Sequence, residues 1–287
     1  MTEAEPLPGD SATAPERATR PRLGRIRVRR VIFLVLVTVL VVQVAFFGRM
    51  GLTWFTQVRR TTPVYDPPVL AGQVVSPGCS GGVYARTAEG VLVITTTGHC
   101  SREGDPKSMP ETGRLVGTAS APSHWETCDR PGKNRCTASD MAYVTLVADM
   151  IPWGHLNAID LGAAGYRVIA AGTRALSCPE VKPGDRVEIN GQGGYRQGGI
   201  IGQQANDFAE DGTYFPCITV SDIAVVSGDS GGIVLVNGIP AGVAAREYAG
   251  HLGFTPLAEG LAEMGLTMCD TPDCGLQPPA GTGAPTQ

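Results

Sequence analysis

An all-β domain that follows a single membrane-spanning helix is the fold class that this sequence predicts. Three observations predict it: 38 glycines and 22 prolines among 287 residues, short apolar runs separated by turn residues, and one long apolar segment near the N-terminus. Glycine and proline at this frequency favour short strands joined by tight turns over long helices. The 43% apolar content is ample for the packed core of one or two domains.

The membrane-spanning helix is predicted over residues 31–50. Its first 17 residues, 31–47, carry no charge, so a helix there can cross hydrocarbon with its backbone groups bonded internally. Seven arginines precede this run within residues 1–30. By the positive-inside rule, residues 1–30 form a cytoplasmic tail and the rest of the chain lies outside the membrane. The sequence therefore predicts a single-pass protein of the cell membrane with its main domain extracytoplasmic.

A cleaved signal peptide is the alternative interpretation of the same segment. Its apolar region is expected to span about 7 to 15 residues before a small-x-small cleavage site. The sequence Val-Ala-Phe-Phe-Gly at residues 44–48 lacks such a site. The sequence therefore favours the anchor without deciding the question.

The charge balance limits the partners of the outer part. Residues 1–47 hold 7 basic and 4 acidic groups, which leaves 16 basic and 23 acidic groups beyond them and a net charge of −7 there. A negative domain supports neither nucleic acid nor anionic lipid as its partner. Membrane contact is thus predicted through the N-terminal helix alone.

The remaining chain divides into a linker, a domain and a tail. Residues 51–77 are rich in polar residues and proline, which predicts a stiff, extended linker. Residues 78–268 hold the strand-type runs and form the predicted domain, and residues 269–287 form a C-terminal tail. The clearest runs are 91–96, 141–147, 167–171, 186–189, 218–220 and 232–236.

One short C-terminal helix is predicted over residues 255–265. Thr255 is suited to the N-cap and Pro256 to the first helical position, and Leu257 and Leu261 lie four residues apart on one face. We expect this helix to pack on the second half of the domain.

Eight cysteines, an even number, all follow the apolar segment. This distribution predicts disulfides formed in an oxidising compartment. Eight cysteines allow 105 pairings, so the pattern by itself selects none of them. A zinc site at Cys128, Cys136 and His124 is the rival interpretation, but their spacing matches no common metal motif, so no metal is predicted.

Three segments supply the residue types of nucleophilic catalysis. Ser230 lies in Gly-Asp-Ser-Gly-Gly, where small neighbours allow substrate to approach its hydroxyl. His99 lies in Thr-Thr-Gly-His-Cys, and Asp140 precedes an apolar strand. A serine becomes a nucleophile when an imidazole removes its proton and a carboxylate holds the imidazole in the right tautomer. We therefore predict Ser230 as nucleophile, His99 as base and then acid, and Asp140 as the orienting group.

The order His, Asp, Ser resembles that of the chymotrypsin-like serine proteases rather than that of subtilisins or α/β-hydrolases. Three further segments, Cys79-Ser-Gly-Gly, Cys100 after His99, and Phe254-Thr-Pro-Leu, resemble the secreted bacterial streptogrisin and α-lytic type. The resemblance covers roughly residues 79–268 and implies two six-stranded Greek-key β-barrels with the active site in the cleft between them.

This resemblance also implies a Cys79–Cys100 disulfide beside His99. For the other cysteines we expect Cys128–Cys136, Cys178–Cys217 and Cys269–Cys274. The backbone N–H groups of Gly228 and Ser230 are implied to form an oxyanion hole. Asp229 is expected in a buried charge pair.

The chain departs from the family at the strand that lines the substrate pocket. Ala245 replaces the serine that usually supports the catalytic aspartate. Arg246 and Glu247 are then expected at the pocket mouth, and Ala224 is expected at its base without a charge. Substrate preference is not predicted from these residues.

The sequence thus predicts a membrane-anchored serine endopeptidase that hydrolyses protein or peptide substrates without a cofactor. A catalytically impaired binding or scaffold protein of the same fold is the alternative, motivated by the alanine at position 245. An esterase would share the same triad. The sequence does not predict the oligomeric state.

Overall fold

A computed structural model describes residues 37–38, 71–123, 135–136, 139–207 and 213–277. The chain divides into two units, residues 1–58 and 59–287. Val37 and Thr38, the described residues of the first unit, are helical. The described residues contain no helix that is both long enough and apolar enough to cross a membrane. The predicted span at 31–50 otherwise lies outside the described residues.

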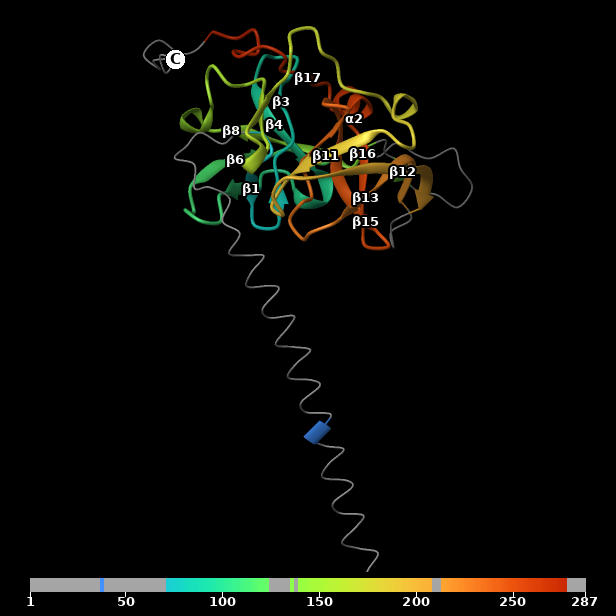
Figure 1. The fold of residues 1–287 in the computed structure, drawn as a ribbon. Coiled ribbons are helices and arrows are strands. Elements are labelled where there is room, and N and C mark those ends of the chain that lie inside the picture. The colour runs from blue at the N-terminus through green and yellow to red at the C-terminus, as the bar shows by residue number, and fades with distance from the viewer. Residues whose placement is uncertain (1–36, 39–70, 124–134, 137–138, 208–212, 278–287) are drawn as a thin grey trace, which may run out of the picture. The chain divides into compact units, whose positions relative to one another are not determined.

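The second unit contains two main β-sheets. Figure 1 shows most of the first in teal and green, around the labels β3, β4, β6 and β8, and most of the second in yellow to red, around the labels β11, β12, β13, β15 and β16. The strands of the first sheet are β3 (Tyr84–Arg86), β4 (Leu92–Thr97), β5 (Pro106–Ser108), β6 (Leu115–Ala119), β8 (Met141–Leu146) and β17 (Thr267–Met268). Those of the second are β7 (Arg135–Cys136), β11 (Arg186–Asn190), β12 (Arg196–Asp207), β13 (Thr213–Ala224), β14 (Ile233–Val236), β15 (Ile239–Tyr248) and β16 (His251–Pro256).

The second sheet closes into a barrel. Its strand order is β12-β11-β14-β15-β16-β13-β7, and β12 also pairs with β13. The six strands from β12 to β13 therefore form a continuous ring, to which β7 adds a short parallel pairing. This closure confirms one predicted six-stranded barrel.

The first sheet also has six strands, in the order β17-β3-β4-β8-β6-β5. Its edge strands β17 and β5 span two and three residues and are not paired with each other within the described part of the chain. Within the described residues, the pairing that would close this sheet into the second predicted six-stranded barrel is not present. Strand β17 comes from the C-terminus, so residues 267–268 belong to this sheet rather than to the end of the second barrel.

Shorter elements connect the two sheets. Two small antiparallel pairs are formed by β1 (Val74–Ser76) with β2 (Cys79–Ser80) and by β9 (Ala158–Asp160) with β10 (Tyr166–Val168). The described residues also form four 3-10 turns: η1 (Gly98–Cys100), η2 (Ala148–Met150), η3 (Gly162–Ala164) and η4 (Cys178–Glu180).

The predicted helix is shorter than expected, because α2 spans Leu257–Glu263. Thr255 does not cap it. Thr255 belongs to strand β16, where it pairs with Val243, and its hydroxyl donates to the carbonyl oxygen of Ser139. Pro256 is consequently the N-cap rather than the first helical residue.

The packing of α2 also differs in part from the expectation. The helix lies against β15 and β16 of the second barrel, as predicted. Leu257 and Leu261 are nevertheless buried in the larger core cluster, together with Met141 and Val144 of the first sheet and Ile233 of the second. The helix thus contributes to a core that both sheets share.

Three of the four predicted disulfides are present. They join Cys79 to Cys100, Cys178 to Cys217 and Cys269 to Cys274. The fourth predicted pair involves Cys128, which lies outside the described residues, as does His124 of the rival zinc interpretation.

Candidate active site

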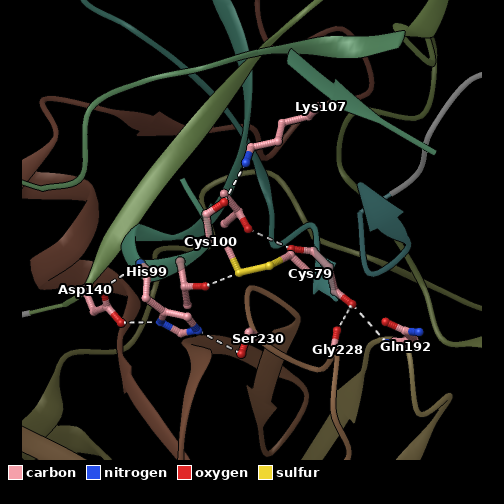
Figure 2. Close-up of a disulfide and its surroundings, with 11 residues drawn as sticks. Cys79, His99, Cys100, Lys107, Asp140, Gln192, Gly228 and Ser230 are labelled. Atoms are coloured by element: carbon pink, nitrogen blue, oxygen red, sulfur yellow. Dashed lines mark hydrogen bonds and ion pairs between the residues drawn. A yellow bond between two sulfur atoms is a disulfide. The ribbon is translucent and has the colours of Figure 1, made fainter. Parts of the chain in front are cut away.

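The structure brings His99, Asp140 and Ser230 together in one hydrogen-bonded series. The Nδ1 atom of His99 lies 2.7 Å from Asp140 Oδ2, and its Nε2 atom lies 3.0 Å from Ser230 Oγ. Figure 2 shows the imidazole between the carboxylate and the hydroxyl. Both distances are within the range of a hydrogen bond. The geometry is therefore that of a base placed between a nucleophile and an orienting acid.

Strand pairing brings His99 and Asp140 together. Strands β4 and β8 are antiparallel neighbours, and Thr97 at the end of β4 pairs with Met141 at the start of β8. His99 follows Thr97 in the turn η1, and Asp140 immediately precedes Met141. The two functional side chains therefore leave adjacent strands at the same edge of the sheet.

Backbone contacts fix Asp140 in this position. Its Oδ1 atom accepts from the backbone N–H of His99 at 3.1 Å, and its carbonyl oxygen accepts from the N–H of Gly98 at 2.6 Å. A Cβ atom on Gly98 would lie 2.7 Å from Asp140 Oδ1, so this position requires glycine. Asp140 has a φ of +47° and its side chain is 2% exposed. Such a conformation is uncommon outside glycine and is often found at functional sites.

Ser230 is held in the turn before β14. Its carbonyl oxygen accepts from the N–H of Ser80 at 2.7 Å, and the N–H of Gly231 donates to Ala244 at 2.8 Å. Gly231 has a φ of +88°, and a Cβ there would lie 2.1 Å from the carbonyl oxygen of Ser80. The turn therefore depends on glycine at this position, which explains part of the Gly-Asp-Ser-Gly-Gly pattern.

Gly228 and Ser230 both line a cavity that opens beside His99, and their backbone N–H groups are the expected oxyanion-hole donors. Within the described residues, neither group has a hydrogen-bond acceptor. The Ser80 hydroxyl holds this loop by donating to the Gly228 carbonyl at 2.8 Å and accepting from the Gln192 N–H at 3.0 Å. Figure 2 shows Gly228 and Gln192 on the same side of the disulfide. Both N–H groups are thus available to an oxygen that enters the cavity.

Asp229 forms the expected buried charge pair. Its side chain is 1% exposed, and its Oδ1 atom lies 2.5 Å from Arg196 Nη2. The carboxylate also accepts from the backbone N–H groups of Gly193 and Val226 at 3.0 and 2.8 Å. A cation from strand β12 therefore neutralises the loop that carries Ser230.

Removal of this cation is expected to destabilise the protein. Arg196→Met would leave Asp229 buried with two N–H partners and no counter-charge, and we expect the free energy of unfolding to fall by about 3 kcal/mol. Urea denaturation measures the change. Arg114→Met is the matched control, because its pair with Asp149 has side chains that are 37% and 65% exposed and is worth at most about 1 kcal/mol. Equal losses in both variants would contradict this account of Asp229.

A cavity of about 390 Å³ opens beside Ser230 and His99. Its wall combines polar groups with a set of apolar side chains, which are Val225, Val226, Ala244, Ala245 and Leu252. Arg246 and Glu247 also line it, as expected. The prediction for Ala224 is wrong: this residue is exposed on β13, where it pairs with His251, and does not line the cavity. Val225 and Val226, which follow it, line the cavity instead.

The sequence did not predict that Arg246 reaches Asp140. Its Nη2 atom lies 3.3 Å from Asp140 Oδ2, while Ala245 beside it is buried and has no hydroxyl to offer. A signal was present, since a charged residue directly follows the position of the missing serine.

Two further residues near the site were not singled out by the sequence pattern. Ser80 supports the loop that carries Gly228. Lys107 is 7% exposed and donates from Nζ to the carbonyl oxygen of Cys100 at 2.5 Å, as Figure 2 shows above the disulfide. Ser80 lies in the Cys79-Ser-Gly-Gly segment, but its contact with Gly228 joins residues 148 positions apart, which no local pattern indicates. Lys107 has no sequence signal beyond its residue type.

No family model matches this chain, and no curated protein matches its sequence. Solved structures do match. A glutamic-acid-specific serine protease aligns at 20% identity and a TM-score of 0.52, over 70% of this chain and 100% of that one. Thermobifida fusca protease A aligns at 22% identity and a TM-score of 0.51, over 70% of this chain and 98% of that one. Cellulomonas bogoriensis chymotrypsin aligns at 22% identity and a TM-score of 0.50, over 71% of this chain and 100% of that one. The domain therefore has the fold of the bacterial chymotrypsin-like serine proteases.

Proposed function

We propose that this protein is a serine endopeptidase that hydrolyses peptide bonds through an acyl-enzyme intermediate. The observation that carries the proposal is the hydrogen-bonded series from Asp140 through His99 to Ser230 at the edge of a cavity. The fold supports it, because the similar structures include serine proteases. No metal or organic cofactor is needed for this chemistry.

The first half of the reaction forms an ester. Ser230 Oγ attacks the carbonyl carbon of the substrate, and its proton moves to His99 Nε2. The N–H groups of Gly228 and Ser230 stabilise the negative oxygen of the tetrahedral intermediate. His99 then donates the proton to the leaving amine, and the C–N bond breaks. Asp140 keeps the imidazole in the tautomer that has its Nε2 lone pair toward Ser230 and stabilises the imidazolium.

The second half releases the product. Water enters, loses a proton to His99 and attacks the ester carbonyl, and the same N–H groups stabilise the second intermediate. The ester bond breaks as His99 returns the proton to Ser230 Oγ. The carboxylic acid product leaves and the site returns to its starting state.

An extended peptide suits the strand beside Ser230. Strand β14 pairs with β15 up to the pair Ile233–Val243, and residues 245–247 continue β15 along the cavity. Ala244 still bonds to Gly231 and Gly232, and beyond it no described strand pairs with this edge of β15. Substrate backbone can add to such an edge as a further strand. Unfolded segments or loops of proteins are therefore the proposed substrates.

The cavity wall predicts an apolar residue on the acyl side of the cleaved bond. A charged side chain against Val225, Val226 and Leu252 would lose hydration. The two charged residues at the edge of the cavity compensate little, because Arg246 is paired with Asp140 and Glu247 is exposed to solvent. We expect peptides with valine, leucine or methionine there to be cleaved at least about 100-fold faster than those with lysine or glutamate. A peptide library with mass-spectrometric readout measures this preference.

The glutamic-acid-specific serine protease provides a contrast, because that protein uses a histidine triad in substrate binding. Among the described residues that line the present cavity, the one histidine is His99, which already contacts Asp140 and Ser230. A library result in which glutamate is preferred would contradict the apolar assignment.

We further propose that residues 31–50 anchor the enzyme and that its domain acts outside the cytoplasmic membrane. The uncharged run, the seven preceding arginines and the disulfides of the domain support this location.

Hydrolysis of an unfolded protein tests the proposal. The purified full-length chain in mild detergent is expected to fragment reduced, alkylated casein, and a fluorophosphonate is expected to stop the reaction. The alternative function is a catalytically impaired binding or scaffold protein, favoured by the buried Ala245 and by the cation beside Asp140. A folded chain that binds extended peptides and cleaves none of them would favour this alternative.

A further inference from the structure

The guanidinium of Arg246 occupies a defined position beside the acid of the proposed triad. Its Nη2 atom lies 3.3 Å from Asp140 Oδ2, the same oxygen that lies 2.7 Å from His99 Nδ1. Asp140 thus contacts the imidazole and a permanent cation through one oxygen. A serine hydroxyl, which would be neutral, is absent at position 245.

The surroundings hold the Arg246 side chain in place. Its guanidinium carbon lies 5.1 Å from the centroid of the Phe215 ring, and Phe215 is fully buried. The Arg246 side chain is 24% exposed and that of Asp140 is 2% exposed. A cation between an aromatic face and a buried carboxylate is screened less by solvent than a surface ion pair.

The other charged groups near the site have separate partners or lie in solvent. Glu263 of α2 accepts from the Ser139 hydroxyl at 2.6 Å, and Lys107 of β5 donates to the Cys100 carbonyl. Asp229 pairs with Arg196, and Glu247 is exposed. Within the described residues, Arg246 is therefore the cation that pairs with Asp140.

This contact bears directly on the protonation of His99. An imidazolium at His99 would be stabilised by the negative charge of Asp140. The positive charge of Arg246 lies at the same carboxylate oxygen and opposes a second positive charge on the ring. The neutral form is the one that can accept the proton of Ser230.

We propose that Arg246 is a positioning residue that holds Asp140 and keeps His99 neutral, and so extends the activity of the enzyme to lower pH. The proposal rests on the proposed function, because it assigns a role relative to the triad. It also explains how the chain functions without a serine at position 245. The ion pair takes over the contact to the carboxylate and adds a charge that a hydroxyl lacks.

The test is the pH dependence of Ser230 modification. The second-order rate constant for reaction with a fluorophosphonate is measured from pH 4 to 9 at low ionic strength, for the full-length protein and its variants. Arg246→Met keeps the apolar stem against Phe215 and removes the charge. We expect the pH of half-maximal rate on the acid side to rise by about one unit. Arg246→Lys, which keeps the charge, is expected to stay close to the wild type.

Two controls make the result specific. Arg114→Met removes one positive charge from a distant exposed pair and is expected to leave the profile unchanged. Arg246→Gln provides a second neutral variant if Arg246→Met does not fold, which circular dichroism at each pH reports. If the wild type reacts and the neutral variants show the same pH of half-maximal rate on the acid side, this inference is overturned and the proposed function stays intact. A folded wild type that fails to react at any pH would overturn the proposed function itself.

Discussion

Ser230→Ala is expected to lower kcat for peptide hydrolysis by about a millionfold, the loss observed when the nucleophile of a serine protease is removed. Its hydroxyl is the group that lies 3.0 Å from His99 Nε2. Alanine leaves the turn intact, because Ser80 and Ala244 bond to the backbone of residues 230 and 231 rather than to the side chain. The residual activity would come from binding and from the oxyanion hole. The measurement is the initial rate on the best library peptide.

Ser108→Ala is the matched control for this variant, since Ser108 lies on strand β5 of the first sheet. It is expected to keep the wild-type rate. Hydrolysis that survives in Ser230→Ala at the level of the control would show that another group is the nucleophile.

Asp140→Asn is expected to lower kcat by about ten-thousandfold with little change in fold. The Asp140 carboxylate accepts from the backbone N–H of His99 at 3.1 Å, and its other oxygen lies 2.7 Å from the ring atom Nδ1 of His99. An amide has one oxygen, so it can accept from only one of these two donors. If its NH2 group faces Nδ1 instead, it stabilises the tautomer that has the proton on Nε2, which cannot accept the proton of Ser230. Kinetics on the same peptide measure the loss.

Asp149→Asn tests whether any loss of a carboxylate has this effect. Asp149 is exposed and pairs with Arg114 on the surface. We expect its rate to match the wild type. A loss of less than about tenfold in Asp140→Asn, with the protein folded, would remove Asp140 from the mechanism.

Much of this architecture could be predicted from local patterns. The apolar runs at 91–96, 141–147 and 186–189 correspond to β4, β8 and β11 to within one residue at each end. Most residues of these three strands are buried, so each strand appears in the sequence as a short run of apolar residues. The run at 167–171 was less accurate, since β10 spans Tyr166–Val168, with both end residues exposed. The long strands β12 and β13 were missed in large part, because their polar residues carry no apolar signal.

Long-range relations could not be predicted in the same way. The pairing of β17 with β3 joins residues 267–268 to residues 85–86, and no local pattern specifies such a pairing. The same holds for Thr255, whose strand pairing with Val243 takes precedence over its N-cap preference. Tertiary contacts decided both outcomes.

The site shows the same division. Its three principal residues stood out because each lies in a motif whose chemistry is recognisable. The contact of Arg246 with Asp140 depends on the direction of one long side chain across the cavity, which neither spacing nor composition determines. The expectation for Ala224 depends on the path of the chain between β13 and Ser230, and in the structure Val225 and Val226 line the cavity instead.

Covalent labelling tests the central claim most directly. A fluorophosphonate forms a P–O bond to an activated serine as fluoride leaves and the serine proton passes to the base. We predict that the full-length protein gains the mass of one phosphonyl group and that peptide mapping places it on Ser230. A folded protein with its disulfides formed that gains no adduct, or gains it on a residue other than Ser230, would contradict the account.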